Sequence, residues 1–137
     1  MKKLLLTALL ASSTIVSAQQ YLTREARLSF DAGSPLEDIE AFTESGSAVF
    51  DASSGKIGVQ VLMTSFQFKR ALMQEHFNEN YVESEKFPKA SFKGTYNEGK
   101  VTGELSIHGV TKEISVPATL REENENFVLT TAFDIIL

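Results

Sequence analysis

Cysteine and tryptophan are absent from this sequence of 137 residues, and positive charge is in short supply. The lack of cysteine excludes disulfide bonds, thiolate metal sites, cysteine nucleophiles and an N-terminal lipidated cysteine. The 13 basic residues stand against 18 acidic ones, which gives a formal net charge of −5. A chain with no surplus of cations is a poor partner for a phosphate backbone, so we expect no nucleic-acid binding.

The composition that remains is that of an ordinary globular domain. Hydrophobic residues make up 42% and charged residues 23%, which excludes disorder, collagen and coiled coil as the overall class. The length fits one domain. Ten phenylalanines supply aromatic mass without a polar group, a composition typical of apolar cores and cavities.

Residues 1–18 have the three regions of a secretory signal peptide. Lys2 and Lys3 form a positive start, an apolar run follows, and a small-residue cleavage pattern ends at Ala18. The apolar run is too short to cross a bilayer, which takes about 20 residues, and no second such run follows. We therefore expect a mature domain of residues 19–137, without an integral membrane segment, in the periplasm or secreted.

The rest of the sequence alternates between apolar and polar residues with the period of half-buried strands. The alternating runs cover residues 21–30, 39–50, 57–63, 90–96, 101–107, 114–120 and 127–137. Turn residues separate the runs, and Gly109 suits a turn that needs a positive φ angle. Gly58, Gly94 and Gly103 lie within the runs, where small residues leave room or allow bends. Many short antiparallel strands at this spacing favour an all-β barrel or sandwich.

One stretch, residues 68–81, departs from the period of two. Apolar residues and a histidine recur there at spacings of three and four, namely Phe68, Leu72, Met73, His76 and Phe77. This spacing predicts one short helix in an otherwise all-β chain. Pro88 follows and restricts Phe87 to an extended conformation.

Three segments carry a family resemblance when they are taken together and in order. They read FKRALMQEHFNENY at residues 68–81, EKFPKASFKG at 85–94 and GELSIHGVTKEI at 103–114. From about Leu28 onward the sequence resembles the YceI-like family of bacterial lipid-binding proteins. The resemblance implies a lipocalin-like antiparallel β-barrel in the periplasm, with the short helix near the mouth. It also implies a ligand, an isoprenoid or other long apolar lipid such as a polyisoprenoid quinone, in an elongated apolar cavity.

The sequence departs from the family pattern at its C-terminal end. Family members continue with further strand sequence, whereas this sequence stops at Leu137 within an apolar run. We therefore expect a barrel that is incomplete at the C-terminus, unless the sequence is a fragment or the barrel closes in another way. An open barrel leaves a strand edge that can pair with another chain, so a homodimer is one expected assembly.

The inward faces of the expected strands supply the candidate ligand-binding residues, which are Leu28, Phe30, Ile57, Val59, Val61, Met63, Phe92, Leu105, Ile107, Val116 and Phe133. From the expected helix, Leu72, Met73 and Phe77 are candidates to gate the cavity. Alternation alone equally fits a packed interior, because small barrels are often filled by their own side chains. A vacant slot lined by these residues is therefore the central hypothesis.

Two other classes of function stay open beside a lipid carrier. An envelope interaction protein without a bound lipid would use the outer wall or an open seam. A metal-dependent enzyme is the weaker alternative: His76 and Glu79 lie three residues apart, beside Glu75, but only His108 adds another imidazole. The sequence has no HExxH pattern, phosphate loop or nucleophile elbow. We therefore expect no enzyme, no catalytic residue, no metal and no cofactor.

Overall fold

The computed structural model describes residues 2–10, 20–31, 40–68, 74 and 85–135. The described strands are β1 (Lys2–Leu10), β2 (Gln20–Asp31), β3 (Glu40–Asp51), β4 (Lys56–Leu62), β5 (Gln67–Phe68), β6 (Lys89–Asn97), β7 (Lys100–Ile107), β8 (Val110–Glu123) and β9 (Asn126–Ile135). A 3-10 turn, η1 (Met63–Ser65), follows β4. The expected all-β class is confirmed.

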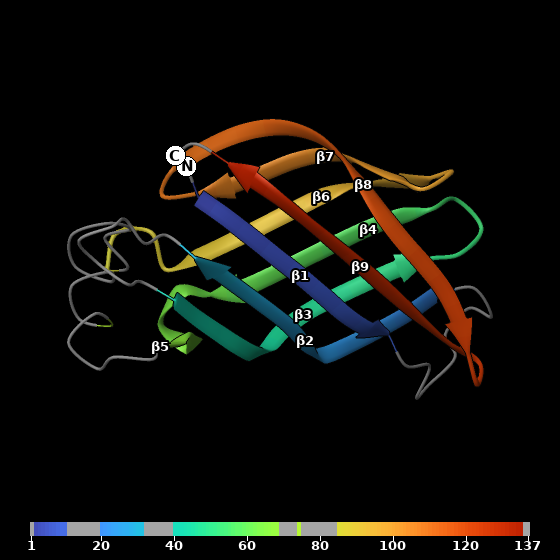
Figure 1. Ribbon diagram of the computed structural model, residues 1–137, viewed down its shortest axis with the longest axis horizontal. Helices are drawn as coiled ribbons and strands as arrows, with labels where there is room; N and C mark the ends of the chain where they lie inside the picture. The colour runs from blue at the N-terminus through green and yellow to red at the C-terminus, as the bar shows by residue number, and fades with distance from the viewer. Residues whose placement is uncertain (1, 11–19, 32–39, 69–73, 75–84, 136–137) are drawn as a thin grey trace.

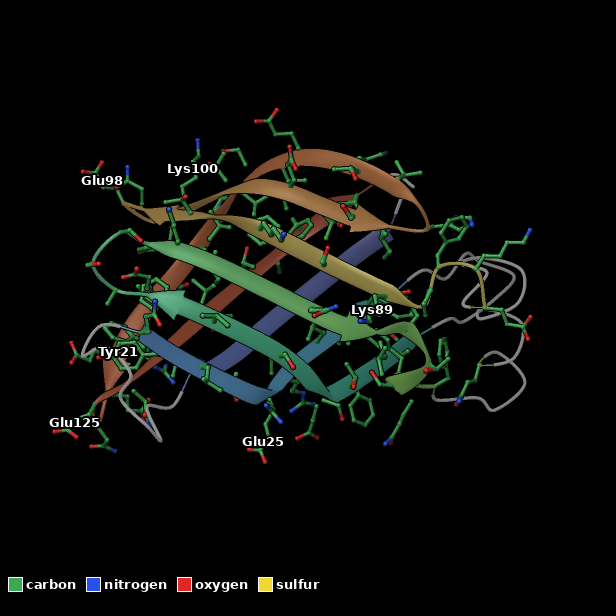
Figure 2. The ribbon with its side chains drawn as sticks, turned by 180° about the vertical axis from the view of Figure 1, so that it is seen from behind. Tyr21, Glu25, Lys89, Glu98, Lys100 and Glu125 are labelled. Atoms are coloured by element: carbon green, nitrogen blue, oxygen red, sulfur yellow. The ribbon has the colours of Figure 1, made fainter. Side chains whose placement is uncertain are left out.

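The described strands form one antiparallel sheet that closes on itself (Figure 1). Their order is β2-β1-β9-β8-β7-β6-β4-β3-β5, and β2 also pairs with β3. Figure 2 shows Glu98, Lys100 and Glu125 at hairpin tips on one end of the barrel, with Tyr21. Lys89 lies at the other end, so β6 runs between the two ends. The expected antiparallel barrel is therefore confirmed.

Strand β1 completes the barrel wall between β2 and β9. It runs antiparallel to both, pairing with residues 27–31 of β2 and residues 127–135 of β9. The barrel thus closes in a way that the sequence left open, through the segment assigned above to the signal peptide. Removal of that segment after export stays a prediction.

The inner face of β2 changes phase at a β-bulge. The period of two placed Leu22 on the same face as Ala26, but the register shifts between Thr23 and Ala26. Leu22 is therefore 49% exposed, while Tyr21 is half-buried and its ring centroid lies 4.8 Å from that of Phe127. An extra residue on one strand moves every side chain before it to the opposite face, which is why the simple alternation was wrong here.

The hairpins between β6 and β9 close with residues of positive φ. The pairs are Glu98-Gly99, His108-Gly109 and Asn124-Glu125. Two consecutive residues of positive φ make a type I′ turn, whose twist matches that of the flanking strands. The positive φ expected of Gly109 is confirmed at 70°.

Part of the expected helix is a strand. Phe68 pairs with Ala41 in β3, and its ring centroid lies 5.8 Å from that of Phe30. The aromatic contact and the strand pairing explain why Phe68 is extended, so the prediction of helix at this residue was wrong. Gln74 is helical. The gate candidates Leu72, Met73 and Phe77, together with His76, lie outside the described residues.

Candidate ligand-binding site

The predicted lining residues on the barrel wall share one apolar interior. Those buried in the core are Leu28, Ile57, Val59, Val61, Met63, Phe92 and Leu105. Those partly buried and packed against the core are Phe30, Ile107, Val116 and Phe133. The structure therefore places these predicted residues on the inner faces of their strands, except that Met63, expected on a strand, is buried in the turn η1 that follows β4. Occupation of that interior by a ligand belongs to the proposal below.

The interior is covered unevenly around the barrel. On the wall formed by β3, β4 and β6, the inner residues Ala48, Val59 and Phe92 are all buried. On β8, by contrast, every inner-facing apolar residue is only half-buried, namely Ile114, Val116, Ala118 and Leu120. Of these the sequence had singled out Val116 alone. Apolar side chains accessible on an inner face are the part of the wall that a ligand can reach.

The exposure of β8 follows from a split in the sheet. Strand β8 pairs with β7 along residues 110–117, but it pairs with β9 only along residues 118–123. Strand β9 pairs with β1 along residues 127–135, so beyond Thr131 β1 is its one described strand neighbour. Figure 1 shows β8 arching away from β9 over this stretch. Within the described part of the chain, residues 110–117 therefore have a strand neighbour on one side only.

Pro117 lies at the point where the two strands part. The amide of Ala118 donates to the carbonyl of Gly99 at 2.9 Å, on the side of β7. Because successive amides on a strand point to opposite sides, the nitrogen of Pro117 faces β9, and it has no hydrogen to donate. The hydroxyl of Thr131 donates to the carbonyl of Pro117 at 2.7 Å. This side-chain bond ends the pairing where the backbone ladder cannot continue.

A cation shares the inner face of β8 with the apolar residues. Lys112 pairs in register with Leu105, and Leu105 with Phe92, whose side chains are both buried. Lys112 itself is half-buried, in phase with Ile114. It is the third residue after the β7–β8 turn, so it lies at that end of the barrel. Sequence reasoning missed this residue because it treated the lining as wholly apolar.

The remaining candidate groups do not assemble into a reactive centre within the described residues. The ring of His108, in the β7–β8 turn, packs edge-on against Phe87, with centroids 5.1 Å apart. Among the described residues no three histidine or acidic side chains are placed to hold a metal ion. Glu75, His76 and Glu79 lie outside that set. No described helix has the length and apolarity needed to cross a membrane.

Comparisons of sequence place the chain beside a known family. The family model described as a YceI-like domain matches residues 15–135. A UPF0312 protein of Photorhabdus laumondii is 32% identical over 90 residues, covering 59% of this chain and 47% of the relative. A UPF0312 protein of Pseudomonas syringae is 31% identical over 91 residues, with the same coverage. The chain spans about half the length of the curated relatives it matches.

Comparisons of structure agree on the fold. A polyisoprenoid-binding domain from Saccharophagus degradans superposes with a TM-score of 0.58 at 8% identity, covering 95% of this chain and 97% of the other. The YceI protein of Campylobacter jejuni superposes with a TM-score of 0.54 at 23% identity, covering 68% of this chain and 63% of the other. At these identities the likeness concerns the fold.

Proposed function

This chain belongs to the YceI-like domain family, and on that premise we propose that it is an exported lipid-binding protein. It holds an amphiphilic isoprenoid-type ligand inside the barrel, as a carrier, a store or a protector of the ligand. The observation that carries the proposal is the inner face of β8, where every apolar side chain is half-exposed, in contrast to the buried residues Ala48, Val59 and Phe92 on the wall of β3, β4 and β6. The similar fold of a polyisoprenoid-binding domain supports the ligand class.

Burial of the ligand's tail supplies the driving force. Removing apolar surface from water contributes about 25 cal/mol per Å². A tail that buries several hundred Å² therefore gains on the order of 10 kcal/mol before the entropic costs of binding. No charged group has to contact the tail. Ile114, Val116 and Leu120 pack against the core but are only half-buried, so their exposed apolar surface supplies contacts for the tail.

The proposal of export is supported by the N-terminal sequence. The positive start, apolar run and small-residue pattern ending at Ala18 are those of a signal peptide. The family match begins at residue 15, close to the expected cleavage position. A periplasmic or secreted location follows from this reasoning. Fractionation of cells that express the chain, with mass spectrometry of the N-terminus, tests it.

Uptake of an added isoprenoid quinone tests lipid binding. We expect native mass spectrometry of the purified chain to show a retained lipid-sized adduct, or one adduct after incubation with the quinone. Val116→Asp places a carboxylate on the inner face and should abolish uptake. Ser115→Asp adds the same charge to the neighbouring outward position, which is exposed, and should leave uptake unchanged.

Thermal melting followed by circular dichroism establishes that both variants are folded. If the unmodified chain takes up no quinone and carries no adduct, the proposal is wrong. If folded Val116→Asp binds as well as Ser115→Asp, the ligand does not lie on this face.

One observation favours the alternative of an envelope interaction protein. Leu22 and Val49 pair in register on the outside of β2 and β3, and they are 49% and 51% exposed. Adjacent apolar side chains on an outer wall suit contact with another protein. A lipid-free dimer in the native mass spectrum would support this alternative over the carrier.

A further inference from the structure

Lys112 stands out on the inner face of the barrel because its neighbours in the same row are buried and apolar. The row runs across the sheet through Val59, Phe92 and Leu105 to Lys112. Glu122, in the same phase at the far end of β8, is exposed. Lys112 is half-buried, so the apolar wall and the cation lie on one continuous surface.

The charge of Lys112 is not neutralised within the described residues. Glu104 and Glu113 pair in register with each other and are exposed on the outer face. No ion pair joins Lys112 to a carboxylate in the part of the chain that the structure describes. A cation beside apolar surface attracts an anion more strongly than one in bulk water, because the effective dielectric constant is lower there.

We propose that the inner face of β8 binds the acidic head group of the ligand through the ammonium group of Lys112. The apolar tail lies against Ile114 and Val116, which follow at intervals of two residues, about 7 Å each. The inference rests on the proposed function and narrows its ligand to long-chain isoprenoid-type lipids with an anionic head group, such as a phosphate monoester. The split that begins at Pro117 keeps this part of the wall accessible.

The free edge of β8 offers another explanation for Lys112, which the test must separate. Proteins protect unpaired strand edges with proline and with inward-pointing charges, and Pro117 and Lys112 fit that description. The same two residues argue against a peptide strand as the occupant of the edge. Proline has no backbone N–H to donate in a hydrogen bond to an added strand. A lipid needs no backbone hydrogen bonds, so the observations favour a lipid.

A matched pair of ligands tests the head group. The full chain is titrated with geranylgeranyl monophosphate and with geranylgeraniol, which have the same tail, and the two dissociation constants are compared. We expect the phosphate to bind about tenfold more tightly, as a charge-assisted hydrogen bond gives. Lys112→Gln should bring the ratio close to one, and Lys112→Arg should preserve it. Lys93→Gln, an exposed lysine on the outside of β6, serves as the control and should leave the ratio unchanged.

The outcomes separate the two proposals. Absence of binding to either ligand overturns the proposed function and this inference together. Equal binding of both ligands, or a ratio that persists in Lys112→Gln, overturns the role of Lys112 and leaves lipid binding intact. Self-association of Lys112→Gln with an unchanged ratio shows that the lysine protects the edge. Displacement of the lipid by an equal concentration of inorganic phosphate also overturns the inference, because the tail would then contribute nothing.

Discussion

Replacing Gly103 by alanine tests how closely strands β6 and β7 approach each other. Gly103 and Gly94 pair in register on the inner face. A Cβ atom on Gly103 would overlap the carbonyl oxygen of Lys93 and lie 2.5 Å from the Cα of Gly94. Both neighbours are backbone atoms, so no side chain can turn away to relieve the clash. The glycine pair therefore allows a close approach that any larger residue prevents.

The expected loss of stability follows from the cost of overpacking. Forcing atoms into a filled site costs about 1–3 kcal/mol, and we expect about 2 kcal/mol for Gly103→Ala. For a chain of this size that corresponds to a fall in Tm of about 8 °C. The matched control is Gly58→Ala on strand β4, where a Cβ would meet no atom within 4 Å. The control should be neutral or slightly stabilising, because alanine restricts the unfolded chain.

Urea denaturation followed by circular dichroism measures both variants, and the midpoint should fall for Gly103→Ala at an unchanged slope. Equal stability of the two variants would refute the close approach of the strands.

Three further predictions concern closure, turns and acid stability. Deleting residues 1–18 removes the β1 neighbour of β2 and of β9, so we expect lower stability or self-association by light scattering, and a fully stable monomer would contradict this. Glu125 has a φ of 67°, so Glu125→Gly should raise the unfolding free energy by about 0.5 kcal/mol in urea titrations, and a loss would count against the turn geometry. Hydrogen bonds from Ser53 hold the pKa of Asp51 below its ordinary value of 3.8. The hydrogen bonds therefore stabilise the folded chain above pH 3.8, and this stabilisation is lost as the pH falls through the lower pKa of folded Asp51. Relative to the unmodified chain, Asp51→Asn should lower the unfolding free energy more at about pH 6 than at about pH 3. Equal losses at both pH values would exclude this role for Asp51.

Alternation predicted most inner faces correctly because each strand has one buried face. Along β4 and β6 the inward positions are those expected, from Ile57 to Val61 and from Ala90 to Phe92. A slip of one residue would expose the whole apolar set, so burial selects a single register. The same rule failed on β2, where the bulge changes the phase. The adjacent exposed charges Arg24 and Glu25 are the signal that the alternation is interrupted there.

Closure of the barrel could not be predicted, because strand pairing is a non-local property. The apolar run after Lys2 and Lys3 fits the pattern of a leader sequence, and in the structure the same residues form strand β1. Local composition cannot decide between two uses that need the same residues. The split, by contrast, had a local signal. Pro117 within an apolar strand run indicates a strand side without a partner, although the pattern does not tell which neighbour is lost.

Strand β1 lies on one side of the C-terminal part of β9, and the split between β8 and β9 lies on its other side. Residues 132–135 of β9 pair with β1 and not with β8. Cleavage after Ala18 would therefore leave these residues without a strand neighbour on either side among the described strands, and the two openings would become one. Phe133 and Val116, both half-buried on the inner face, would border it. A mature chain with this opening should take up lipid faster than the full chain, and stopped-flow measurements of quinone uptake compare the two. Equal rates would show that the ligand does not pass between β8 and β2.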